Sequence, residues 1–138
     1  MAQKKDASLS ENSFPILDEV LATDKEAQKI SNFWMTAGDN IRKFEKKIPS
    51  SRKIAIYGAG FYGSFIASIM KEHDQVEYIV DQNPFLQGKK QNGIPIVSPM
   101  DLPKEINTIL VGLNPSFAKK LIDDISTFKK RNLNYYFL

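Results

Sequence analysis

The hydrophobic positions fall into two patterns along the chain. From Arg52 onward, short apolar runs alternate with helical stretches, which is typical of a parallel sheet with crossover helices. Strands are expected at 53–57, 76–80, 94–97, 108–113 and 134–138. Helices are expected at 61–71 and 116–130, the second with Asn114 as its cap, and one helical turn at 99–103. The pattern therefore predicts an α/β fold with a small, doubly wound parallel sheet of about five strands.

The segment before this sheet has the pattern of a single helix. The order Thr23-Asp24-Lys25-Glu26 has the form of a capping box and predicts a helix start. Apolar residues then recur at alternating steps of four and three, at Ile30, Trp34, Ala37, Ile41, Phe44 and Ile48. Two interpretations stay open for the helix Thr23–Ile48: it lies on the domain or on a neighbouring segment, or it supports self-association or recruits a partner. Gly38 is a point at which it can split.

These patterns predict three parts of the chain. Residues 1–13 are polar without a period that could bury a face, and we expect a disordered tail. Residues 14–49 form the N-terminal helical segment, and residues 50–138 form the α/β domain. The 17 residues from Ile54 to Met70 carry no charge, but three glycines and a change from strand to helix favour a buried strand and a helix start over a membrane span.

Composition excludes several kinds of chemistry. The 138 residues include 19 Lys and Arg against 16 Asp and Glu, a net charge of +3 that is too small to indicate nucleic-acid binding. There is no cysteine and one histidine, His73, so disulfides, thiolate nucleophiles and clustered metal ligands are not expected. The N-terminus lacks the apolar region of a signal peptide, which favours a cytoplasmic protein.

The strongest local signal is a glycine-rich turn between the first strand and the first helix of the α/β domain. Gly58, Gly60 and Gly63 have the G-x-G-x-x-G spacing, which allows a tight turn, the approach of a phosphate and close helix packing. Asp81 ends the next strand, where an acid receives a ribose hydroxyl. The candidate binding residues are Gly58, Ala59, Gly60, Phe61, Tyr62, Gly63, Asp81 and Asn83. The alternative is a purely structural turn, with Asp81 capping a loop.

Candidate catalytic residues are not found. None of the five tyrosines has a lysine four residues later, so the Tyr-x-x-x-Lys pair of short-chain-type dehydrogenases and epimerases is absent. The first glycine loop also lacks the G-x-G-x-G form that is more usual in methyltransferases. The acid at Asp81 disfavours a 2′-phosphate, so NAD is preferred to NADP if either binds.

Three stretches together resemble a known family. They are Ile56-Tyr57-Gly58-Ala59-Gly60-Phe61-Tyr62-Gly63, then Tyr78 to Lys89, then Gly93 to Leu102. Residues 52–126 resemble the Rossmann-like accessory domain of sugar-polymer enzymes. Close relatives of that domain are the C-terminal domain of deoxysugar C-methyltransferases and the N-terminal nucleotide-binding-like domain of polysaccharide-biosynthesis nucleotide-sugar dehydratases. The resemblance implies that the ligand phosphate binds at Gly58, Gly60 and Gly63, with the loop from Asp81 to Gly88 along the same crevice.

The functional expectation follows from the motif order and the resemblance. We expect a small Rossmann-like module that binds a nucleotide or nucleotide-sugar, is not catalytic alone, and acts with an enzyme of surface-polysaccharide or modified-sugar biosynthesis. One alternative is the cofactor-binding part of an NAD-dependent oxidoreductase or a sugar methyltransferase. The other is an interaction protein whose glycine turn is structural. The cofactor, NAD or a nucleotide-sugar among others, is left open.

Overall fold

The computed structural model describes the backbone of residues 13–138 and the side chains of residues 23–138. The expected tail at 1–13 lies outside the described residues except for Ser13, which begins the first helix. Contacts divide the chain into a unit that ends at Thr36 and a second unit, Ala37–Leu138. The expected division after residues 13 and 49 stays a prediction.

The second unit contains a six-stranded sheet in the order β3-β4-β2-β1-β5-β6. The strands are β1 (Ile54–Tyr57), β2 (Val76–Val80), β3 (Lys90–Gln91), β4 (Ile94–Val97), β5 (Thr108–Val111) and β6 (Asn134–Phe137). All neighbouring pairs are parallel except β3 with β4. The predicted parallel α/β sheet is therefore confirmed, and each of the five expected strands is present within two residues of its predicted bounds.

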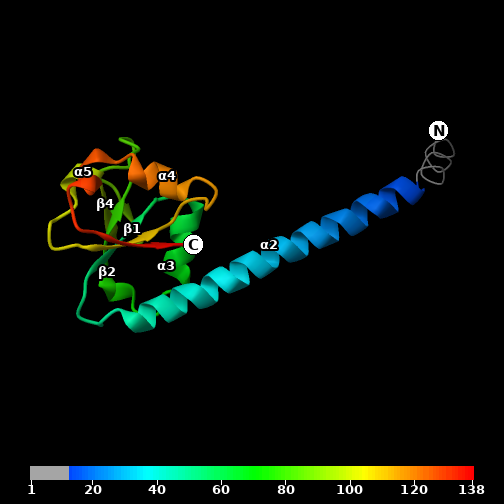
Figure 1. Ribbon diagram of the computed structural model, residues 1–138, viewed down its shortest axis with the longest axis horizontal. Helices are drawn as coiled ribbons and strands as arrows, with labels where there is room; N and C mark the ends of the chain where they lie inside the picture. The colour runs from blue at the N-terminus through cyan, green and yellow to red at the C-terminus, as the bar shows by residue number, and fades with distance from the viewer. Residues whose placement is uncertain (1–12) are drawn as a thin grey trace. The chain divides into compact units, whose positions relative to one another are not determined.

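Helices cover both faces of this sheet (Figure 1). The face toward α3 (Phe61–Ile69) buries Ile54, Ile56 and Leu110. The face toward α4 (Ala118–Asp123) and α5 (Ser126–Lys129) buries Ala55, Tyr57, Ile109 and Val111. Alternate residues of β1 thus face opposite helical layers, as the period of two in a strand requires. Short 3₁₀ turns lie at His73–Gln75 (η1) and Pro99–Asp101 (η2), the second within the predicted turn at 99–103.

The N-terminal helix α2 runs from Ser13 to Lys47, so the predicted start at Thr23 is wrong. The residues before Thr23 include Leu17, Glu19, Leu21 and Ala22, which favour helix, and Pro15 lies in the first turn, where a missing N–H costs little. The helix also continues through Gly38 without a break.

The apolar stripe of α2 divides between two environments. In the second unit, Ala37 and Ile41 are buried, and Phe44 and Ile48 pack against the α3 face of the sheet. The Phe44 ring stacks on Tyr136 of β6 with ring centroids 4.5 Å apart. In the first unit, Ile30 remains 58% exposed. The interpretation of a helix lying on the domain is therefore confirmed for the last third of α2, and self-association through the rest stays a prediction.

Two further differences from the expected elements have local causes. The strand β3 was not expected, yet Asn92 and Gly93 both have positive φ, which is the Asn-Gly hairpin turn that joins β3 to β4. The expected helix at 116–130 is divided, because the backbone at Ile125 is extended and Ser126 and Thr127 are weak helix formers. Asn114 caps the turn before α4 by accepting from the Ser116 amide at 3.0 Å.

Candidate functional site

The glycine-rich turn joins β1 to α3 at the carboxyl edge of the sheet. Gly58 has a φ of +105°, a conformation that other residues rarely adopt. Its amide donates to the Val80 carbonyl at 2.7 Å, and the Gly112 amide donates to the Tyr57 carbonyl at 2.7 Å. The turn is thus held by the ends of both strands that neighbour β1.

Gly63 has a packing role. A Cβ atom at Gly63 would overlap the carbonyl oxygen of Gly58, so α3 comes close to the turn only because this side chain is absent. Gly112 directly follows β5 and also has no space for a side chain, since a Cβ there would lie 2.5 Å from the Gly63 Cα. The sequence analysis missed Gly112. A glycine directly after a buried strand is the signal that could have indicated a close backbone approach.

Gly60 differs from its two neighbours in the motif. Its φ is −91°, which any residue can adopt, and a Cβ built on it meets nothing within 4 Å. Gly60 is the residue before α3, and no side chain caps the helix there. Phe61 follows and is 71% exposed, with its ring edge-on to that of Tyr62. Open space therefore lies over Gly60.

Asp81 contacts the glycine turn, as the motif order predicts, and its carboxylate holds the local backbone by accepting from two amides. Its Oδ2 accepts from the Ala59 amide at 2.9 Å, and its Oδ1 accepts from the Asn83 amide at 2.8 Å. The Asn83 side chain in turn accepts from the Phe85 amide at 3.0 Å. Asp81 and Asn83 thus connect the loop after β2 to the turn after β1. A role for either of them in ligand binding stays a prediction.

Tyr57 is the last residue of β1 and carries an unusual hydroxyl group. The residue is 3% exposed, and its hydroxyl has no hydrogen-bond partner among the described residues. Burial raises the pKa of the Tyr57 hydroxyl above its ordinary value near 10, and the Asp81 carboxylate raises it further, so the hydroxyl keeps its proton into the alkaline range. A buried hydroxyl without a hydrogen-bond partner lowers the free energy of unfolding, so the Tyr57 hydroxyl destabilises the fold beside the turn.

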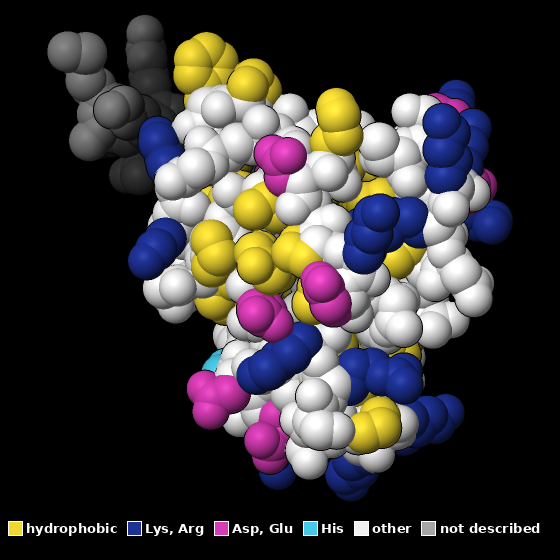
Figure 2. Space-filling view, turned by 90° about the vertical axis from the view of Figure 1, so that its left-hand side faces the viewer, with side chains coloured by type: hydrophobic (Ala, Val, Ile, Leu, Met, Phe, Trp, Pro, Cys, Tyr) yellow, Lys and Arg dark blue, Asp and Glu magenta, His cyan; other side chains and the backbone are white. Residues whose placement is uncertain are grey.

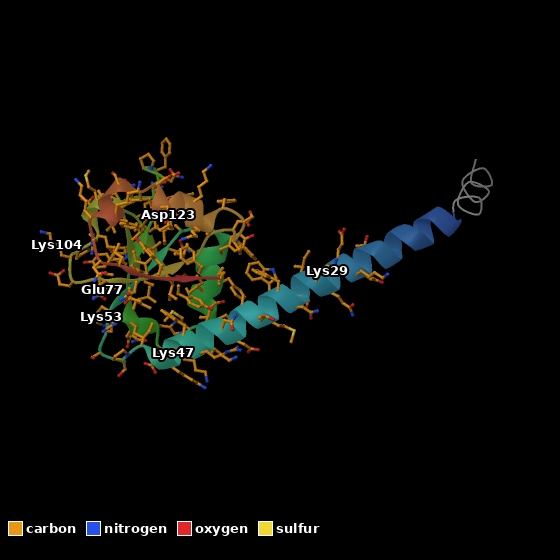
Figure 3. All side chains as sticks on the ribbon, viewed as in Figure 1. Lys29, Lys47, Lys53, Glu77, Lys104 and Asp123 are labelled. Atoms are coloured by element: carbon orange, nitrogen blue, oxygen red, sulfur yellow. The ribbon has the colours of Figure 1, made fainter. Side chains whose placement is uncertain are left out.

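Three cavities of the second unit have linings that do not include the glycine turn. One is a groove of about 910 Å³ bordered by α3, β2 and the β3–β4 turn, with Ser64, Glu77 and Gly93 in its lining. Lys53 borders it and donates from Nζ to the Asp74 carbonyl at 2.9 Å. Figure 3 shows Lys53 and Glu77 together, near the amino ends of β1 and β2. The predicted site residues and this groove therefore do not coincide.

The charged side chains on the surface do not single out a binding site. On the face shown in Figure 2, Lys and Arg side chains lie among Asp and Glu side chains, with hydrophobic side chains reaching the surface between them. Within residues 23–138, no group of three or more His, Asp or Glu side chains could hold a metal ion. No helix in the described part of the chain is long and apolar enough to cross a membrane.

Comparison with known proteins adds a family. The family model of the C-methyltransferase C-terminal domain matches residues 25–137, which includes most of α2 and the whole sheet. No curated protein and no solved structure matches the chain. The C-methyltransferase part of the expected resemblance is thereby supported, whereas the resemblance to nucleotide-sugar dehydratases stays a prediction. Because the match covers most of the sequence, the chain belongs to the C-methyltransferase C-terminal domain family.

Proposed function

We propose that this domain binds a nucleotide or nucleotide-sugar at the carboxyl edge of β1 and β2, and that it presents this ligand to a separate sugar-modifying enzyme or domain. The observation that carries the proposal is the open space over Gly60. Gly58 and Gly63 are required by the fold itself, but neither packing nor backbone conformation requires a glycine at position 60. A phosphate group that approaches the backbone supplies the missing reason.

The surroundings of Gly60 support the same assignment. Gly60 directly precedes α3, and the amino end of a helix favours a negatively charged group. Asp81 lies beside the turn, and each of its carboxylate oxygens has a second lone pair beyond the one that accepts a backbone amide. A ribose hydroxyl can therefore donate to Asp81 without breaking its hydrogen bonds to the amides of Ala59 and Asn83. The same carboxylate repels a 2′-phosphate, which favours ligands with a free ribose hydroxyl.

The family fits a binding role better than a catalytic one. A C-methyltransferase requires a methyl donor and a base or acid at the reacting carbon, and we have assigned no side chain of this chain to these roles. The Tyr57 hydroxyl has a raised pKa and stays neutral, so it is not suited to act as a base. We therefore assign the methyl-transfer chemistry to another domain or protein.

A titration of the purified chain tests the proposal. Thymidine diphosphate, uridine diphosphate, NAD and S-adenosylmethionine are each added while the thermal unfolding temperature and the heat of binding are measured. A ligand present at about 100 times its dissociation constant stabilises the folded state by about 2.7 kcal/mol. We expect a nucleoside diphosphate to produce this stabilisation. Stabilisation by NAD alone would favour the cofactor-binding alternative.

Substitution of Gly60 locates the binding. Gly60→Phe places a ring in the open space, so we expect it to weaken nucleotide binding at least about tenfold while the fold is retained. Gly60→Ala is the graded control, with a smaller loss. The circular dichroism and the unfolding temperature without ligand verify the fold of both variants. Unchanged affinity in Gly60→Phe would overturn the assignment of the site to the glycine turn.

A further inference from the structure

Large apolar side chains are exposed after four neighbouring parallel strands. Phe61 follows β1, Phe85 follows β2, Met100 follows β4 and Phe117 follows β5, with exposed fractions of 71%, 82%, 74% and 49%. The order of strands in the sheet is β4-β2-β1-β5, so these residues follow the carboxyl edge in the order Met100, Phe85, Phe61 and Phe117. Exposed aromatic and Met side chains gathered on one edge indicate a contact surface.

Phe85 lies in a loop that crosses the carboxyl end of β4. The loop starts where the Asp81 amide donates to the Val97 carbonyl at 3.0 Å, between β2 and β4. It ends where the Gly88 amide donates to the Ile96 carbonyl at 2.9 Å, near β3 on the opposite side of β4. Met100 is the third residue after the end of β4. Phe85 and Met100 are thereby brought to the same corner of the carboxyl edge.

The loop that carries Phe85 is ordered by its own hydrogen bonds. Besides the bonds of Asp81 and Asn83 described above, the Gln87 Nε2 donates to the Asp81 carbonyl at 2.8 Å. The Phe85 amide itself is held by the Asn83 side chain. The backbone is therefore fixed while the ring faces water, so a ligand that covers the ring does not have to order the loop first.

We propose that Phe85 and Met100 form the subsite for the base of a bound nucleotide. This inference rests on the proposed function, which places the phosphate at Gly60 and the ribose at Asp81. Adjacent strands are about 4.8 Å apart. Gly60 follows β1, Asp81 follows β2, and the Phe85–Met100 corner lies over β4. The three positions thus follow one another in the order of phosphate, ribose and base.

The chemistry of this corner indicates which ligands it accepts. A phenyl ring and a thioether offer flat apolar contact, which every nucleobase can use through its π face. The corner selects a nucleobase-containing ligand over a sugar phosphate, with little preference among bases. We expect uridine, thymidine and adenosine diphosphates to bind with affinities within about tenfold of one another.

The test compares two phenylalanines on the same edge. Phe85→Ser removes a ring that is 82% exposed, so the core stays intact, and Phe117→Ser is the matched control on the β5 side. The full chain and both variants are titrated with uridine diphosphate and with inorganic pyrophosphate. We expect Phe85→Ser to weaken the binding of uridine diphosphate about tenfold or more and to leave the affinity for pyrophosphate unchanged. We expect Phe117→Ser to change neither affinity. Met100→Ser should act in the same direction as Phe85→Ser.

The outcomes separate this inference from the proposed function. Equal uridine diphosphate affinity in the unmodified chain and Phe85→Ser would overturn the base subsite and leave the phosphate site standing. A loss in Phe117→Ser but not in Phe85→Ser would place the base on the β5 side, which also overturns it. If neither pyrophosphate nor uridine diphosphate binds the unmodified chain, the proposed function itself fails, and the subsite with it.

Discussion

Gly60 and Gly63 stand three residues apart in one motif but are glycines for different reasons. Gly63 has no space for a methyl group, because the Gly58 carbonyl fills it, whereas Gly60 faces open space. Gly63→Ala should therefore lower the free energy of unfolding by about 3 kcal/mol, since backbone must move. Gly60→Ala should cost less than about 1 kcal/mol. Urea unfolding of both variants measures the difference, and equal losses would contradict the packing role of Gly63.

The Tyr57 hydroxyl leads to a prediction about alkaline pH. Burial and the Asp81 carboxylate raise its pKa above the ordinary value near 10. The folded state therefore holds this proton more tightly than the unfolded state does. The resulting stability is fully present below about pH 10 and is lost as the pH rises further. Burial raises the pKa values of Tyr135 and Tyr136 in the same direction.

Tyr57→Phe tests this effect. At pH 7 the variant should be as stable as the unmodified chain or more so, because it removes a buried hydroxyl that lacks a partner in the described structure. Above pH 10 its free energy of unfolding should fall less steeply. Urea unfolding at pH 7 and at pH 11 measures both effects. A parallel loss of stability in the two proteins would show that Tyr57 does not titrate as described.

Helices α2 and α3 approach each other at Gly38. A Cβ at this position would lie 3.7 Å from the Ile69 Cδ1, which is an ordinary contact, and the position is helical. Gly38→Ala should thus raise the free energy of unfolding by about 0.5–1 kcal/mol, since alanine loses less conformational freedom on folding. Denaturant unfolding measures the change. A destabilised variant would mean that the contact between α2 and α3 is tighter than the structure indicates.

The connection between β4 and β5 depends on a side chain from the far end of the chain. Arg131 donates to the carbonyls of Leu102, Pro103 and Ile106 at 2.9, 2.8 and 2.6 Å. Arg131→Ala should cost about 2–3 kcal/mol, because it removes charge-assisted bonds. The exposed neighbour gives the control: Lys130→Ala should change stability by less than about 0.5 kcal/mol. Similar effects of the two substitutions in thermal unfolding would contradict this role of Arg131.

The boundary of the second unit decides where the chain can be shortened. The stretch from Ala37 to Pro49 supplies Ile41, which is fully buried, and Glu45, whose carboxylate accepts from the amides of Lys71 and Glu72. A chain that begins at Ser50 should be less stable than one that begins at Ala37 by at least about 3 kcal/mol. Comparing their urea unfolding checks this. Equal stability would support a domain that begins at residue 50.

Much of the fold and the position of the glycine turn could be predicted from the sequence, because the signals are local. The unbroken apolar run from Ile54 to Tyr57 predicts a strand with two buried faces. The order of strand, glycine turn and helix then places a turn at the carboxyl edge. The position of Asp81 at the end of the next strand brings it to the same edge. The Asn92–Gly93 hairpin had an equally local signal, which the sequence analysis did not use.

Local sequence patterns thus specify the types of most elements, the parallel sheet and the edge that carries the candidate site. Contacts between distant segments specify which residues fill each space. In the folded chain Gly112 lies against Gly63, the Asp81 Oδ2 accepts from the Ala59 amide, and Arg131 donates to the loop after β4. Only part of the apolar stripe of α2 is buried. This difference follows from the range of the interactions. The period of apolar positions fixes which face of an element is buried, but the partner of a given atom is contributed by residues distant in sequence, and no local pattern encodes it.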